Sequence, residues 1–164
     1  MEAALFWIFA AIAVASALTA ITRRNPISSA LALAVTLFAV AGLFAMLSAH
    51  LLFILQILVY AGAIIVLILF VIMLLNLAPE DLHEMRLSPR KLALSAVACA
   101  IACALSLRAI GGVRMGQAPA APGFGTAAEV SRVLYTRMLF PFEIVGLILL
   151  VGILGAVALA KKGD

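Results

Sequence analysis

The chain has 164 residues, of which 67% are hydrophobic and 11% are charged. A soluble domain is about 45–50% apolar and about 25% charged, so this composition predicts an integral membrane protein and leaves no room for a separate soluble domain. The net charge of +4 does not indicate nucleic-acid binding, because the basic residues lie at the ends of apolar runs, where membrane topology and lipid head groups account for them.

The first half of the chain predicts three membrane spans in quick succession. The first covers about residues 3–21 and ends before an Arg-Arg-Asn-Pro sequence. Pro26 cannot continue a helix already under way, but it suits the first turn of the next one. The second span covers about 27–49 and the third about 51–76, with only His50 between them. These two spans must therefore form a tight antiparallel hairpin or nearly abut at the membrane interface.

The second half of the chain predicts two further spans and one surface helix. After a dense polar loop, the fourth span covers about 92–110 and is the weakest, because Arg108 must extend to the membrane surface. Residues 111–125 are rich in Gly, Pro and Ala and are expected to be irregular. Apolar residues at helical spacing in 126–137 predict a short amphipathic helix at the interface. The fifth span covers about 140–160.

The distribution of basic residues predicts the orientation of these five spans, because cytoplasmic loops carry an excess of Lys and Arg. An odd number of spans places the two termini on opposite sides. The richer side is expected to be cytoplasmic, so the N-terminus lies outside and the C-terminus inside. The richer side holds Arg23, Arg24, Arg86, Arg90, Lys91, Lys161 and Lys162, and the other holds Arg108, Arg114, Arg132 and Arg137.

Side chains that carry chemistry are sparse, and the sequence predicts no catalytic residue and no metal site. Cys99 and Cys103 share a helix face and suit helix packing better than metal binding, since no His or carboxylate in the run completes a site. Glu143 is the one ionisable candidate inside a span. It either stabilises the start of the fifth helix or makes a proton or lipid contact at the outer face.

The third span holds the most distinctive local pattern. Residues 51–75 run without a charge, and only Gln56 and Tyr60 carry side-chain hydrogen-bonding groups; four apart, they are expected to share a face. Gly62 weakens the helix by roughly 1 kcal/mol relative to Ala, so a π-bulge is least unfavourable there. The patch Ala61-Gly62-Ala63 therefore marks either a conformational switch or a site of close helix packing.

Three stretches together resemble the J-type core membrane subunit of complex I, the proton-pumping NADH:quinone oxidoreductase. LQILVYAGAIIVLILFVIMLLN resembles the third helix of that family, and NPISSALALAVTLFAVAGLF resembles the second, with its Asn-Pro entry. LYTRMLFPFEIVGLILLVGILGAVALAKK resembles the last helix, including its Phe-Glu pair. The resemblance covers about residues 27–76 and 124–162. Arg137 departs from it, because that position is often acidic or polar in the family.

The resemblance implies a multi-pass subunit of the bacterial inner membrane with five transmembrane helices and no redox centre. NADH, FMN, iron–sulfur clusters and quinone would belong to other subunits of the complex. Its expected partners are the K-, A-, H- and N-type membrane subunits and lipids, with quinone affecting it only indirectly. In the family, a π-to-α transition of the third helix opens a water path to the pumps. Matched onto this sequence, that region is Tyr60, Ala61, Gly62, Ala63, Val66 and Phe70.

These expectations lead to one hypothesis and two alternatives. The leading hypothesis is a complex I membrane subunit that helps couple quinone reduction to proton translocation through a switchable third helix. The first alternative is a structural scaffold subunit of a related hydrogenase or cation-antiporter complex. A free-standing small transporter is disfavoured, because no charged or broken-helix binding site is apparent.

Overall fold

The computed structural model describes residues 2–75, 89–112 and 123–161, and all regular secondary structure in these ranges is helical. The polar loop before the fourth span, most of residues 111–125, and the basic residues Arg86, Arg114 and Lys162 lie outside the described residues. In chain order the helices are α1 (Glu2–Thr22), α2 (Pro26–Met46), α3 (His50–Leu55), the π-helix η1 (Gln56–Ile64), α4 (Ile65–Leu75), α5 (Pro89–Gly112), α6 (Ala127–Arg137) and α7 (Leu139–Ala160).

Four of the described helical rods are long and apolar enough to cross a membrane. They are α1, α2, the continuous run His50–Leu75 and α7. Helix α5 contains a shorter apolar stretch, Ala93–Ala109. The chain is therefore an all-α, multi-pass membrane protein, as the composition predicts.

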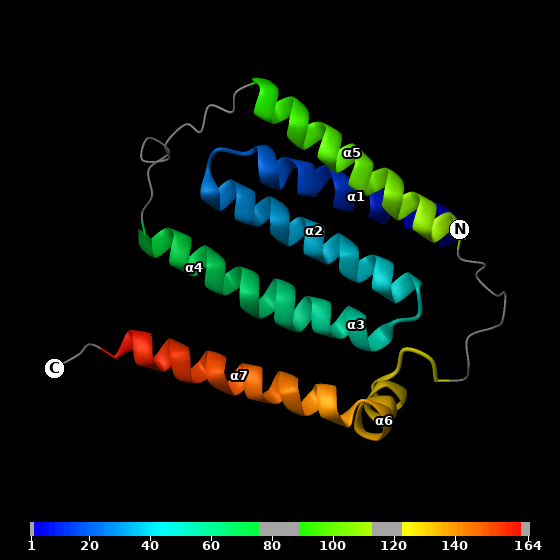
Figure 1. The fold of residues 1–164 in the computed structure, drawn as a ribbon, viewed down its shortest axis with the longest axis vertical. Coiled ribbons are helices and arrows are strands. Elements are labelled where there is room, and N and C mark those ends of the chain that lie inside the picture. The colour runs from blue at the N-terminus through cyan, green and yellow to red at the C-terminus, as the bar shows by residue number, and fades with distance from the viewer. Residues whose placement is uncertain (1, 76–88, 113–122, 162–164) are drawn as a thin grey trace.

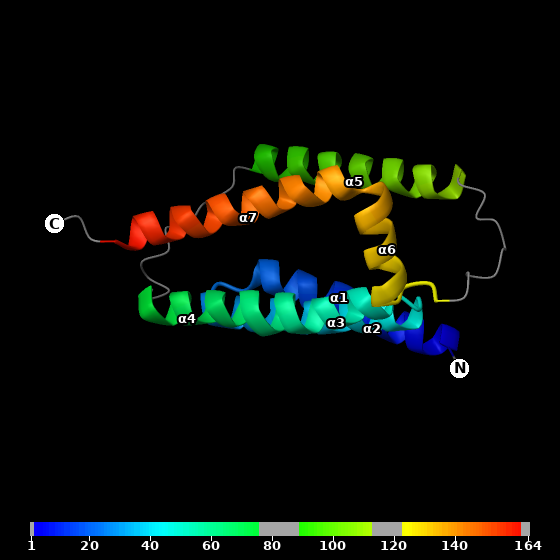
Figure 2. The same cartoon turned by 90° about the horizontal axis from the view of Figure 1, so that it is seen from below.

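The helices lie in two layers joined by α6. One layer holds α1, α2 and the α3–η1–α4 rod, which run antiparallel with α2 in the middle (Figure 1). The other layer holds α5 and α7, and α6 crosses from one layer to the other (Figure 2). Among the described residues, α7 makes its substantial contacts only with α6. Helix α7 is thus connected to the first layer through α6 and the residues before it.

Small residues and hydroxyl groups hold α1 against α2. The hydroxyls of Ser16 and Thr36 are joined by a 2.9 Å hydrogen bond between the two helices, and the Ser29 hydroxyl donates to the Ala20 carbonyl. The ring of Phe9 lies over Gly42, where a Cβ would be only 2.6 Å from a ring carbon. In lipid, such small residues and polar contacts replace the hydrophobic driving force that holds soluble helices together.

Local sequence signals fix both ends of α2. At its start, the Asn25 side chain accepts hydrogen bonds from the backbone N–H groups of Ile27 and Ser28, and proline occupies the first turn. At its end, the N–H of Ala49 donates to the Phe44 carbonyl, and Ser48 adopts a left-handed φ of +58°. This is a Schellman turn. Helix α2 consequently ends at Met46, earlier than the expected end near residue 49, because the turn uses those last residues.

Replacing Gly42 with Val is expected to destabilise the α1–α2 pair by about 1–3 kcal/mol, the usual effect of overpacking a filled contact. The added side chain would displace the Phe9 ring. The measurement is the thermal stability of the detergent-solubilised protein and its yield in membranes. Gly152→Val in α7 is the control, because nothing lies within 4 Å of a Cβ there. Equal stability of the two variants would contradict the close contact.

Much of the apolar surface of this chain is exposed. The buried hydrophobic residues among those described are five alanines and Ile65, and α7 has no buried residue. Large side chains such as Phe140 and Leu159 are 72% and 90% exposed. An apolar surface of this extent requires lipid or other protein chains around it.

Candidate functional site

The candidate site is the π-helical segment in the middle of the long rod His50–Leu75. Nine residues, Gln56–Ile64, form η1, and the N–H of Ile65 donates to the Tyr60 carbonyl five residues earlier. Gly62 lies inside this segment, and a Cβ there would be 3.1 Å from the Ile57 carbonyl oxygen, also five residues earlier. Glycine therefore fits the wider turn with less crowding than any other residue. Short π-helical segments frequently occur at functional sites.

The π-segment changes which residues face α2. The buried residues of the rod are Gln56, Ala61 and Ile65, which are 8%, 6% and 2% exposed and are spaced five and then four apart. An α-helix turns about 100° per residue, so residues five apart would lie about 140° apart and could not both face the same neighbour. The extra residue in η1 therefore places Ala61 and Ile65 on the same face of the rod as Gln56, the face that packs against α2.

The residues matched to the family's switch region divide between two elements. Tyr60, Ala61, Gly62 and Ala63 lie within η1, whereas Val66 and Phe70 lie on α4. Of the six, only Ala61 is buried. The Tyr60 side chain is 50% exposed, and Val66 and Phe70 are similarly exposed. The structure thus places one small residue of this set against α2 and leaves its large side chains facing outward.

Gln56 and Tyr60 do not share an environment, in contrast to the expectation from their spacing. Gln56 is buried while Tyr60 is half-exposed, and no hydrogen bond joins their side chains. The reason is that both lie in η1, where the 3.6-residue period of the α-helix no longer applies.

Glu143 lies on α7 with its side chain exposed. It is beyond the first turn of that helix, and the N-cap residue Met138 makes no side-chain capping bond. Among the described residues, no hydrogen bond or ion pair of the Glu143 carboxylate occurs. Cys99 and Cys103 on α5 are both exposed. In the same ranges, no three His, Cys, Asp or Glu side chains gather as a metal site would require.

A second feature, which sequence reasoning did not locate, is a contact between the α2–α3 turn and the residues before α6. The Leu51 N–H donates to the Gly125 carbonyl at 2.9 Å. Gly125 has a φ of +74°, and a Cβ there would collide with the Ser48 carbonyl oxygen and lie 2.9 Å from the Ala49 Cα. Only glycine fits this close approach of two backbones. The amphipathic pattern of α6 indicated a surface helix, but no sequence signal identified its docking point.

The fold and this site define a multi-pass α-helical membrane protein in which one span is interrupted by a π-helix. Most of its apolar surface is exposed and requires contact with lipid or other protein chains. Comparison with known proteins identifies its relationships. The chain belongs to the NADH-ubiquinone/plastoquinone oxidoreductase chain 6 family, whose model matches residues 16–159. The resemblance to the J-type subunit of complex I is thereby confirmed.

Individual relatives agree with this family over nearly the whole chain. It is 34% identical to NADH-quinone oxidoreductase subunit J of Rhodobacter capsulatus, over 96% of this chain and 80% of the relative. It is 33% identical to the subunit J of Escherichia coli K12, over 96% and 85%. It is 30% identical to the F(420)H(2) dehydrogenase subunit J of Methanosarcina mazei, over 98% and 92%.

Proposed function

We propose that this chain is a non-catalytic membrane subunit of a proton-pumping NADH:quinone oxidoreductase and helps couple quinone reduction to proton translocation. Its family and its relatives support membership in such a complex. In this proposal NADH, FMN, iron–sulfur clusters and quinone are bound by other subunits. The K-, A-, H- and N-type membrane subunits and lipids surround this chain and cover its exposed apolar helices.

The proposed topology has five spans in the bacterial inner membrane, with α5 as the fourth. Helix α5 has 24 residues, which correspond to about 36 Å at 1.5 Å per residue, enough for the ~30 Å hydrocarbon core. The described basic residues favour an outside N-terminus and a cytoplasmic C-terminus. Arg23 and Arg24 lie between α1 and α2, Arg90 at the start of α5 and Lys161 just after α7, and these helix ends lie together at one end of the rods (Figure 1). The end of α5, which carries Arg108, and helix α6, which carries Arg132 and Arg137, lie at the other end (Figure 1).

The spacing of the buried residues is the observation that carries the proposed mechanism. If η1 returned to α-helix, everything beyond it would turn by about one residue, or about 100°. Tyr60 and Ile64 would then replace Ala61 and Ile65 against α2. A large phenol would occupy the place of a methyl group, and α4 would have to rotate or move away from α2.

This rotation would gate a water path, which is the role we assign to η1 and α4. The exposed side chains of Val66 and Phe70 would rotate about the axis of α4, so these two apolar groups would move from one side of the rod to another. Apolar constrictions of this kind control pores by wetting and dewetting. The rod His50–Leu75 carries no Asp, Glu, Lys or Arg, so its contribution is a change of shape and not titration.

Co-purification tests membership in the complex. Flavin- and iron–sulfur-containing subunits that oxidise NADH are expected to accompany this chain in mild detergent. Recovery with antiporter-like or hydrogenase subunits alone would favour the scaffold alternative. One relative is named a subunit of F(420)H(2) dehydrogenase, so both NADH and reduced F420 should be assayed as donors. Activity with the latter alone would correct the donor but keep the membrane role.

Replacing Gly62 with Leu tests the switch. The new side chain would press on the Ile57 carbonyl and favour the α-form, because a Cβ at position 62 would already lie only 3.1 Å from that oxygen in the π-form. We expect normal assembly, retained quinone reduction and lower proton pumping, measured with the complex in vesicles. Gly152→Leu in α7 is the control for adding the same side chain elsewhere, since no other atom of this chain lies within 4 Å of a Cβ at that position. Wild-type pumping by an assembled Gly62→Leu complex would rule out the switch.

A further inference from the structure

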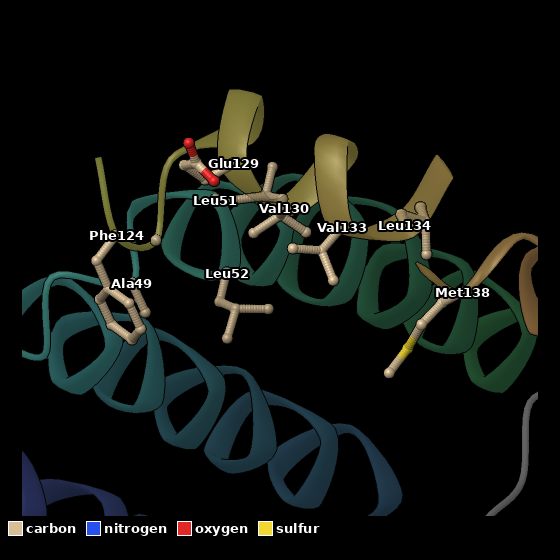
Figure 3. A pocket seen from close by; sticks show the side chains of 10 residues that line it. Ala49, Leu51, Leu52, Phe124, Glu129, Val130, Val133, Leu134 and Met138 are labelled. Atoms are coloured by element: carbon tan, nitrogen blue, oxygen red, sulfur yellow. The ribbon is translucent and has the colours of Figure 1, made fainter. Parts of the chain in front are cut away.

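A hollow of about 530 Å³ lies beneath α6, apart from the π-segment. Helix α6 covers it, the α2–α3 turn and the start of α3 form its floor, and Met138 lies at the end toward α7 (Figure 3). Its volume is within the range of protein ligand sites, about 300–1,000 Å³. The lining side chains are apolar except for one carboxylate, and they are Ala49, Leu51, Leu52, Phe124, Gly125, Glu129, Val130, Val133, Leu134 and Met138.

The orientation of α6 places this hollow at the level of the membrane surface. Helix α6 crosses between the two layers at the ends of the spans (Figure 2), so a membrane crossed by the spans would have α6 along its surface. Its apolar residues Val130, Val133 and Leu134 point into the hollow toward α3 (Figure 3). An in-plane amphipathic helix lies where lipid head groups meet acyl chains. The hollow therefore begins at the depth where the tails of a phospholipid start.

One negative and one positive charge lie at the edge of the hollow. Glu129 lines it, and the Arg132 guanidinium is 3.9 Å from the Glu129 carboxylate. The Arg132 and Glu129 side chains are 77% and 48% exposed. An ion pair this long and this exposed holds its partners weakly, so both groups remain available to an outside ligand.

We propose that this hollow binds a phosphatidylethanolamine molecule, with one acyl chain in the hollow and the head group on α6. The ammonium of the head group would bind Glu129 and its phosphate would bind Arg132, so both charges on the rim are matched. An anionic lipid has no ammonium group to neutralise the Glu129 carboxylate, so its phosphate would be repelled by that carboxylate. A partner helix is a poorer fit, because it is 10–12 Å across and the hollow is closed on one side by α6.

The occupant can be identified by photo-crosslinking in the otherwise wild-type complex. Leu134 lines the hollow, and we propose to replace it with a benzophenone-bearing amino acid. After illumination, the chain is expected to gain the mass of one phosphatidylethanolamine. A crosslink to another protein subunit would overturn the proposal, because a partner segment would then fill the hollow.

A second experiment fills the hollow with a larger side chain and measures the number of lipid molecules that the purified complex retains. Val133→Trp places a large ring inside it, and the purified complex is expected to retain one phosphatidylethanolamine molecule fewer than wild type. Leu159→Trp in α7 is the control, because that side chain is 90% exposed and does not line the hollow. An unchanged lipid count in an assembled Val133→Trp complex would refute the site. If that variant does not assemble, the crosslink decides.

Head-group recognition has its own test. In vesicles containing phosphatidylethanolamine and phosphatidylglycerol in equal amounts, the Leu134 crosslink of the wild-type chain should carry mainly the former. Glu129→Gln should remove this preference while leaving the crosslink to lipid. Glu2→Gln is the control, since Glu2 lies at the start of α1 and does not line the hollow. The same product ratio in all three proteins would contradict the role of Glu129.

Discussion

Deletion of Tyr60 is expected to leave the complex assembled and able to reduce quinone, yet to remove most of its proton pumping. Without this residue, Gln56 and Ala61 become four apart in the chain, which is the spacing of neighbours on one face of an α-helix. The buried face toward α2 would be kept while the extra residue of η1 is lost. The rod would then have a single favourable arrangement and could not alternate.

The measurement is the ratio of protons pumped to quinone reduced, with the complex in sealed vesicles. Tyr60→Ala is the matched control, because it removes the side chain but keeps the number of residues and hence the π-segment. If Tyr60→Ala lost pumping as completely as the deletion, the phenol and not the helix geometry would be responsible. Full pumping by the assembled deletion variant would exclude a gating role for η1.

Replacing Gly125 with Ala is expected to detach α6 from the α2–α3 turn and to destabilise the chain by more than about 2 kcal/mol. A left-handed conformation costs about 1–2 kcal/mol for a residue with a Cβ, and the lost hydrogen bond from Leu51 adds about 0.5–1.5 kcal/mol. The collision of the new Cβ with the Ser48 carbonyl would add to both.

Proteolysis in membranes measures this effect, because α6 and its preceding turn should become sensitive to cleavage when they detach. Gly123→Ala is the control. Gly123 also has a positive φ, +86°, but its Cβ would meet only side-chain atoms, the nearest being the Glu129 Cγ at 3.3 Å. The difference between the two variants therefore isolates the backbone contact with the α2–α3 turn. Equal sensitivity would mean that backbone strain alone matters.

The sequence predicted those parts of the fold that depend on residues close together in the chain. Long uncharged runs require helices that satisfy their own backbone hydrogen bonds in lipid, so α1, α2, the long rod and α7 follow directly. Asn25 and Pro26 marked the start of α2 for a similar local reason. Glycine at position 62 indicated a weak point within the third span.

The parts that the sequence could not predict depend on contacts between distant residues. The α2–α3 turn needed Ser48 in a left-handed conformation, which is rare for serine and left no pattern to read. The separation of Gln56 from Tyr60 follows from the length of η1, and periodicity assumes an α-helix throughout. The hollow under α6 is built from residues more than 70 positions apart in the chain, which no local pattern connects.

The surface of α2 has a mechanical consequence for the neighbouring rod. Ala30 and Ala41 are 6% and 1% exposed, and eleven residues, about three turns, separate them, so they share a face. That face is turned away from Thr36, which is hydrogen-bonded to α1. Helix α2 is therefore hydrogen-bonded to α1 on one side and presents these two alanines on the other. Methyl groups offer shallow ridges, so in the proposed switch the rod would meet little steric resistance from these two alanines when it turns.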